Sequence, residues 1–133
     1  ESHRNQLEWN FQRTLTKINY HIHTDAIKEN LIPKAITKQQ SNFVYANEAD
    51  LLNVALFGIT AKEWRIQNPE SKGNIRDEAC IEQLVVLSNM ESINALLIGK
   101  EISQSERLAE LNKVAITQMK SLLSNKSIKK LNE

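Results

Sequence analysis

The feature that most constrains the fold is a long apolar segment, ACIEQLVVLSNMESINALLIGK, from Ala79 to Lys100. Its apolar residues cover most of the circumference of a helix rather than one stripe: Ile81, Leu84, Val85, Val86, Leu87, Met90, Ile93, Leu96, Leu97 and Ile98. The β-branched residues favour a strand, but the segment is far longer than an ordinary strand of about 5–6 residues. A helix that is apolar on most sides belongs in the middle of a bundle. We therefore predict a central helical spine.

The bounds of this helix follow from local signals. Asn74 or Asp77 is expected to open it, and Gly99 to end it. The polar residues within it mark places where it kinks or divides: Ser88, Asn89, Glu91, Ser92 and Asn94. On either side lie segments with narrower apolar stripes, which predicts amphipathic helices wrapped around the spine.

The first of these segments runs from Ser2 to Ile32, and one helical face carries Leu7, Phe11, Leu15, Ile18 and Ile22. The helix either continues through HTDAIKENLIP or restarts there with Thr24 as its N-cap. Pro33 ends it, because the residue before proline resists helical geometry. The following KAITKQQSN is predicted to be a loop, and FVY is too short to build a sheet on.

Three further helices are predicted from their caps. ANEADLLNVALFG is capped by Asn47 and ended by Gly58, and a short helix begins at the capping box Thr60–Glu63 and ends before Pro69. The last helix begins at the box Ser103–Glu106, and the tail SNKSIKKLNE is predicted to fray. Its apolar face carries Leu108, Leu111, Ala115, Met119 and Leu122.

These elements predict an all-α protein, an irregular bundle of four to five helices with little or no sheet, in a single domain spanning residues 1–133. The chain has 133 residues, the size of one domain, and only three Gly and two Pro, which favours long helices over tight turns. No run reaches the ~20 apolar residues of a membrane span, so we expect no membrane. The single cysteine, Cys80, allows no intrachain disulfide, suits the cytoplasm and is expected to be a buried structural thiol.

The stretch FGITAKEWRIQNPESKGNIRDEA carries the candidate nucleic-acid or anion site. Residues 47–78 resemble a helix-turn-helix arrangement, in which Lys62 and Arg65 lie on the capped second helix. Lys72, Asn74 and Arg76 lie in the following turn, where backbone N–H groups and Arg76 could cradle an anion. Acidic residues balance the basic ones in this stretch, and the net charge of the whole chain is only +1. The alternative is a packed corner with Trp64 as its hydrophobic anchor.

Catalytic and metal-binding patterns are missing from the sequence. His21 and His23 are two residues apart and diverge by about 200° on a helix, so they cannot share an ion. Asp25 lies at i+4 from His21, which is more typical of a surface hydrogen bond than of a ligand set. There is no Gly-rich phosphate loop, serine elbow or HExxH motif. We expect no catalytic residue, no metal and no cofactor.

The N-terminal helix carries an apolar residue outside its stripe, Trp9. A helix with apolar residues on two faces is expected to pack on a second domain or a second copy. Coverage of a neighbouring helix in the same core explains Trp9 equally well. Trp9 and Trp64 are therefore the candidate partner-surface residues.

Four segments together resemble the region that follows the KilA-N domain in bacterial and phage-derived proteins: RTLTKINYHIHTDAIKENLIP, VYANEADLLNVALFGITAKEWR, NPESKGNIRDEACIEQLVVLSNMES and SERLAELNKVA. The resemblance covers roughly Arg4 to Ala115 and rests on whole segments. It implies a cytoplasmic, DNA-associated protein whose KilA-N domain lies upstream of Glu1 and is not part of this fragment. None of that domain's DNA-contacting residues can be transferred to this chain.

From the sequence we expect a non-enzymatic helical accessory domain of a KilA-N-type DNA-binding protein, acting by self-association or by binding a protein partner. Nucleic acid is expected to bind through the upstream domain rather than through this fragment. The alternative is a DNA-binding module in its own right, using the segment at 47–78.

Overall fold

The computed structural model describes the backbone of residues 2–124, with the side chains of that range except those of residues 2–5, 7–9 and 12. The described residues form five helices and no strand: α1 (Ser2–Asn30), α2 (Lys38–Phe57), α3 (Ala61–Gln67), α4 (Ile81–Gly99) and α5 (Gln104–Ser124). This confirms the predicted all-α class. The predicted fraying of SNKSIKKLNE falls almost entirely outside the described residues.

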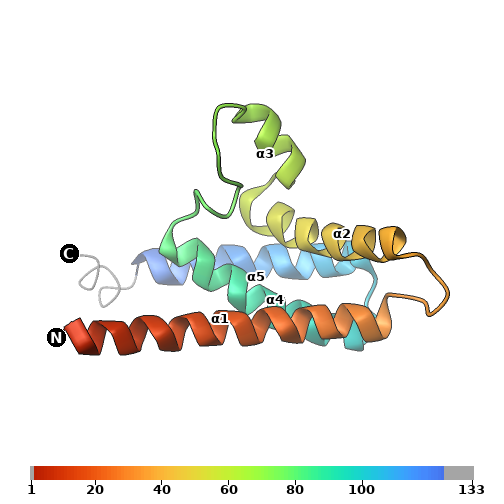
Figure 1. Cartoon of the computed structure of the whole chain (residues 1–133), viewed down its shortest axis with the longest axis horizontal. Coiled ribbons are helices and arrows are strands. Elements are labelled where there is room, and N and C mark those ends of the chain that lie inside the picture. Colours follow the sequence, from red (N-terminus) through yellow and green to blue (C-terminus); the bar gives the residue numbers. More distant parts are fainter. Residues whose placement is uncertain (1, 125–133) are drawn as a thin grey trace.

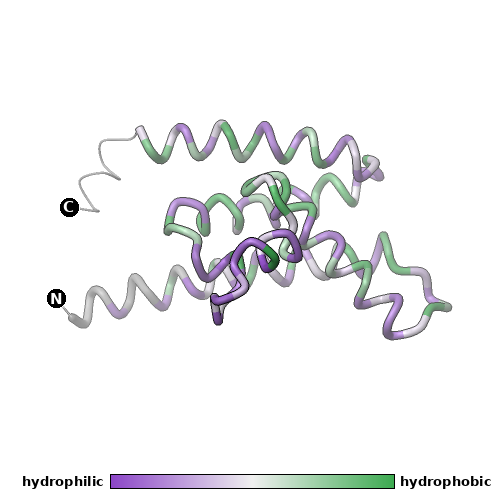
Figure 2. Tube along the Cα trace, turned by 90° about the horizontal axis from the view of Figure 1, so that it is seen from above, coloured by the Kyte–Doolittle hydropathy of each residue, from purple (hydrophilic) through white to green (hydrophobic). Residues whose placement is uncertain are grey.

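Helix α4 lies between α1 and α5, and α2 packs on α5 and more lightly on α4 (Figure 1). Seen from above, α1 and α5 run along opposite sides of the molecule (Figure 2). The long apolar segment is therefore the spine of the bundle, as predicted. It is one undivided helix of 19 residues, without the break expected at its polar residues.

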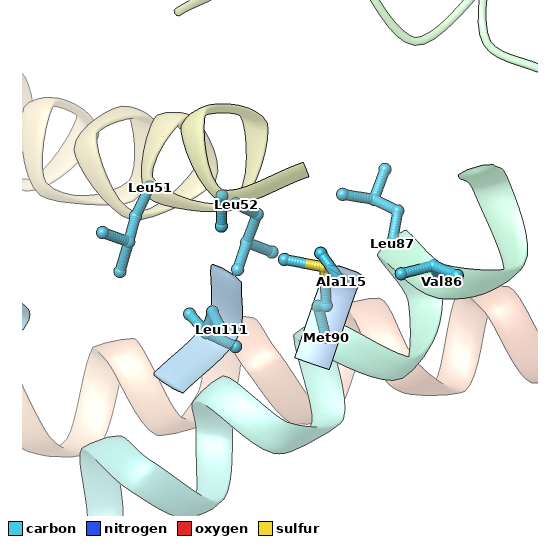
Figure 3. Packing of buried hydrophobic residues seen from close by; sticks show 8 residues of the cluster. Leu51, Leu52, Val86, Leu87, Met90, Leu111 and Ala115 are labelled. Carbon is cyan, nitrogen blue, oxygen red and sulfur yellow. The ribbon is translucent and has the colours of Figure 1, made fainter. Parts of the chain in front are cut away.

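The apolar core joins three helices. It is formed by Leu51, Leu52 and Ala55 of α2, Val86, Leu87 and Met90 of α4, and Leu111 and Ala115 of α5 (Figure 3). The stripe predicted on the last helix faces this core, as expected. None of the described side chains of α1 belongs to this cluster, so this part of α1 is attached to the bundle in another way.

The N-cap of α2 lies ten residues before the predicted cap Asn47, which was wrong. Of the loop expected at residues 34–42, residues 34–37 precede the helix as predicted, and residues 38–42 belong to it. Its N-cap is Thr37: the Thr37 hydroxyl accepts a hydrogen bond from the Gln40 amide at 3.1 Å, and the Gln40 side chain accepts one from the Thr37 amide at 2.9 Å. This reciprocal capping box satisfies two N–H groups at the start of the helix. The FVY stretch lies inside α2.

The predicted start of α4 was also wrong. Asn74 closes a turn instead, because its side-chain oxygen accepts from the amides of Arg76 and Asp77 at 2.9 and 3.2 Å. The Asp77 carboxylate accepts in return from the Asn74 amide at 2.8 Å. The helix starts at Ile81, with Cys80 as its N-cap residue. Cys80 is exposed at this end, which corrects the prediction of a buried thiol.

Other predicted boundaries hold. Helix α1 is continuous, and Thr24 lies inside it, donating to the His21 carbonyl at 3.2 Å instead of capping a new helix. Gly58 ends α2 at a φ of +82°, a conformation that favours glycine. The Thr60–Glu63 capping box is present, and the Ser103 hydroxyl accepts from the Glu106 amide at 3.4 Å.

By length and composition, α4 is also apolar enough to cross a membrane, with a mean hydropathy of 1.2 over its best window. The sequence estimate above had found no such run. The core helix of a packed bundle passes the same test, and α4 packs on α1, α2 and α5 here, with 39% of that window buried.

Candidate functional site

Helix α1 attaches to α4 through a polar face. The Asn19 side-chain amide donates to the Ser88 hydroxyl at 2.8 Å, and His23 Nε2 lies 2.9 Å from the Asn94 side-chain amide. Ile27, one turn further on, is only 1% exposed and completes the contact. These residues, four apart, lie one above another on one side of a helix.

Most of the predicted apolar stripe of α1 faces solvent, which corrects the expectation that it would cover the spine, and Leu15 also lines a cavity between α1 and α4. Phe11 is 67% exposed, Leu15 47%, Ile18 48% and Ile22 43%. At about 100° per residue, this stripe is centred roughly 120° from Asn19, His23 and Ile27. The side chain of Leu7, the first member of the stripe, lies outside the described residues.

The exposed stripe continues onto α4 at a shallow hollow of about 500 Å³. Its apolar lining is Ile22 and Ala26 of α1 with Ala95 and Leu96 of α4, and Leu96 is 59% exposed. Asp25 and Glu29 border the same hollow. Contiguous exposed apolar side chains of this kind mark interaction surfaces in soluble proteins. We call the surface formed by Phe11, Leu15, Ile18, Ile22 and Leu96 the α1 face.

Beneath α1, a buried polar network ties four parts of the chain together. At its centre, the Glu48 carboxylate pairs with the Arg107 guanidinium, and both side chains are 3% exposed. Asn94 donates to Glu48 at 3.1 Å and accepts from Arg107 at 2.9 Å. Gln104 also donates to Glu48, at 2.9 Å. Through these hydrogen bonds the network connects α2, α4 and α5 to His23 of α1.

Burial sets the charge states in this network. It lowers the pKa of His23 to about 4, against the attraction of Glu48, so the imidazole is neutral near pH 7. Its Nε2 then accepts the hydrogen bond from the Asn94 amide. For Glu48, burial by itself raises the pKa of the carboxyl group. Hydrogen bonds from Arg107 and Asn94 outweigh this effect, so the pKa is lowered. We interpret the network as structural, because its polar side chains already form hydrogen bonds or an ion pair with one another.

A second group of charged side chains lies where α1 and α4 begin to run side by side. A cavity of about 1000 Å³ separates the two helices there, and Glu91 and Arg76 both line it. Glu91 is 5% exposed, and burial raises its pKa to about 7, with Arg76 acting in the opposite direction. The same burial lowers the pKa of Arg76. Two ionisable groups with shifted pKa values thus line the same cavity.

The structure does not gather the predicted anion-binding residues into one site. Arg65 donates to the backbone carbonyls of Ser71 and Gly73, and its guanidinium lies 5.2 Å from the Trp64 ring centroid. Arg76 points inward and donates to Asn53 and to the Ala49 carbonyl, at 3.3 and 3.4 Å.

The remaining three candidates, Lys62, Lys72 and Asn74, are exposed. Asn74 holds the turn described above. The arginines predicted for an anion thus stabilise the 65–76 segment, and the two lysines stay on its surface.

Of the two tryptophans predicted for a partner surface, the structure describes the side chain of Trp64 and not that of Trp9. Trp64 is half-buried on α3, which projects from the bundle (Figure 1) and contains no fully buried residue. It covers the corner rather than anchoring it in the core. The side chain of Trp9 lies outside the described residues. Within the described part of the chain, no three His, Cys, Asp or Glu side chains gather as a metal site would require.

Sequence reasoning missed the polar network and the Glu91–Arg76 pair. The members that contact one another are single polar residues separated by 13 to 71 positions along the chain, so no sequence motif reveals them. The one signal was the row of polar residues within the apolar α4, where Ser88, Glu91 and Asn94 recur every three residues. That spacing marks a polar stripe on an otherwise apolar helix, which was interpreted as a kink.

Comparisons of the chain with protein-family models, with curated proteins and with solved structures found no match. The resemblance to the region after the KilA-N domain therefore stays a prediction.

Proposed function

We propose that this chain is a non-enzymatic helical association domain that pairs with a second copy of itself through the α1 face. The observation that carries the proposal is the orientation of α1. This helix turns Asn19 and His23 toward the bundle and leaves Phe11 and Ile18 in water. Burial of apolar surface contributes about 25 cal/mol per Å², so covering this row stabilises an assembly.

A second copy suits this surface because the surface complements itself. A two-fold interface uses the same patch on both partners. With the two α1 helices antiparallel and the axis near Ile18, Phe11 of one copy lies opposite Asp25 of the other, which borders the hollow. Phe11 then reaches the hollow lined by Ile22, Ala26 and Leu96, and the symmetry forms this contact twice.

The size of the α1 face predicts a reversible dimer. From Phe11 to Ile22 the helix rises about 16 Å, and the patch covers a few hundred Å² per copy, below the ~800 Å² of a standard stable interface. We expect a dissociation constant in the micromolar range.

In the wider context of the KilA-N resemblance, the domain would pair two upstream DNA-binding domains. Two-fold pairing raises the effective concentration of the second binding event. The alternative, DNA binding through residues 47–78, has less support because Arg65 and Arg76 are occupied by backbone carbonyls and Asn53.

Sedimentation equilibrium tests the proposal directly. The wild-type chain is expected to shift from monomer to dimer between about 1 and 200 µM, a range set by the micromolar affinity. Ile18→Glu is expected to keep the helix content of the wild type and to remain monomeric, because it places a charge at the centre of the interface. Ile116→Glu is the matched control: Ile116 is 61% exposed on α5, away from the α1 face, and this variant should still dimerise.

A wild-type chain that stays monomeric throughout that range, or an Ile18→Glu variant that dimerises normally, overturns the proposal.

Cysteine crosslinking tests the antiparallel arrangement, in a Cys80→Ser background that removes the native thiol. Ile18→Cys is expected to form an intermolecular disulfide readily, because the axis brings the two positions together. Phe11→Cys should not, because two residues placed fourteen positions apart across the dimer are separated by about 21 Å. Efficient crosslinking of Phe11→Cys would instead indicate a parallel pair.

A further inference from the structure

The cavity of about 1000 Å³ between α1 and α4 has apolar walls and a charged end. Leu84, Val85 and Leu87 of α4 line it, together with Leu15 of α1. This mixture of apolar lining and a few polar groups is typical of small-molecule sites, whose volumes run from about 300 to 1,000 Å³.

Glu91 lines this cavity, where Arg76 acts on its charge without hydrogen-bonding to it. It is 5% exposed, and within the described part of the chain no hydrogen bond reaches its carboxyl group. Every fully enclosed side-chain nitrogen or oxygen among the described residues does have a hydrogen-bond partner. The carboxyl oxygens of Glu91 must therefore retain contact with the cavity that Glu91 lines. A buried polar group in this state is stabilised by a ligand that completes its hydrogen bonds.

The charges around the cavity favour an anion. Arg13 and Lys17 of α1 line it and are exposed, and Arg76 reaches it from the turn before α4. The other titratable group of α1 at the cavity is Tyr20, and Asp50 of α2 interacts with Arg76 from behind. Three cations thus face a single carboxyl group at this site.

We propose that this cavity binds a small amphipathic carboxylate, whose apolar body lies against α4 and whose carboxylate meets Arg13 and Lys17. The site is separate from the proposed association surface, apart from Leu15, which both share. It does not depend on dimerisation.

Ligand binding is coupled to a proton. Glu91 has a pKa of about 7, so near neutral pH it is present in both forms. The protonated carboxyl donates a hydrogen bond to the bound carboxylate, whereas the ionised form repels it. Binding therefore takes up a proton, and affinity rises as pH falls from 8 to 6.

Titration calorimetry with decanoate as the probe tests the proposal. We expect saturable binding of one decanoate per chain, with affinity about tenfold higher at pH 6 than at pH 8, the change for uptake of up to one proton per bound ligand. Decyltrimethylammonium has the same chain and the opposite charge, and should bind at least tenfold more weakly. Equal binding of both probes would show non-specific apolar adsorption and overturn the proposal.

Variants separate the roles of the charged groups. Glu91→Gln keeps the shape of the side chain and is expected to bind decanoate with an affinity that no longer changes between pH 6 and 8. Arg13→Glu/Lys17→Glu should weaken binding about tenfold or more at either pH. Lys62→Glu/Lys72→Glu makes the same change of net charge away from the cavity and should bind as the wild type does. A pH dependence that survives Glu91→Gln, or equal losses in both charge-reversed variants, contradicts the proposal.

Discussion

At the residue scale, two buried ionisable side chains respond to pH in opposite directions. His23 has a pKa of about 4 in the folded chain against 6.5 ordinarily, so the folded state resists its protonation. Its contribution to stability is complete above pH 6.5 and is lost as pH falls toward 4. Glu91, raised from 4.5 to about 7, contributes fully below pH 4.5 and loses its contribution as pH rises through 7.

We predict that these two contributions largely offset each other in the wild type between pH 5 and 6.5. Each shift corresponds to about 3 kcal/mol over its full range, at roughly 1.4 kcal/mol per unit. Glu91→Gln removes one of them, so the free energy of unfolding should then rise with pH across this window. Urea denaturation at several pH values measures the slope. A slope equal to that of the wild type would show that Glu91 is ionised in the folded chain at pH 5.

The Glu48–Arg107 pair sits at the centre of the polar network, with both side chains 3% exposed. We predict that Glu48→Ala lowers the free energy of unfolding by about 3–5 kcal/mol, because it leaves Arg107 buried without its counter-charge. Lys113→Ala is the contrasting case: its pairing with Glu110 is exposed and 3.9 Å long, and such pairs contribute about 0–1 kcal/mol. Denaturation midpoints that fall equally in both variants would contradict a special role for the buried pair.

At the element scale, the caps decide where the helices begin, and the prediction succeeded where a capping box stood next to an obvious apolar pattern. The Thr60–Glu63 capping box starts α3 in this way, and Gly58 likewise ends the apolar pattern of α2. The start of α2 was missed because the first turns after Thr37 are polar, KQQSN, and carry no apolar periodicity. Tertiary contact further along, at Leu51 and Leu52, stabilises the whole helix, including these polar turns.

The two candidate caps of α2 give a direct test. Thr37→Ala is expected to lower the free energy of unfolding by about 1 kcal/mol, since it removes the hydroxyl that accepts from the Gln40 amide. Asn47→Ala lies in the middle of α2, where alanine has the higher helix propensity, and should be neutral or slightly stabilising. Thermal denaturation of the two variants distinguishes these outcomes, and a larger loss in Asn47→Ala would contradict the observed start of the helix.

At the scale of the whole molecule, one apolar cluster holds α2, α4 and α5 together, while polar contacts hold α1. Leu111 is fully buried where these three helices meet. We predict that Leu111→Ala lowers the free energy of unfolding by about 2–5 kcal/mol, through lost burial and the cavity left behind. Ile116→Ala, on the exposed side of the same helix, should change it by about 0.5 kcal/mol or less. Equal losses in the two variants would contradict the observed orientation of α5.

The sequence by itself determined the fold class, the spine and the core face of α5. Apolar periodicity reports which residues avoid water, and for α4 and α5 that periodicity pointed at the core. Only the tertiary structure decided which face of α1 meets the bundle. Asn19 and His23 found hydrogen-bond partners on α4, and Phe11 and Ile18 were left outside. Periodicity cannot predict this choice, because it depends on polar partners some 70 residues away along the chain.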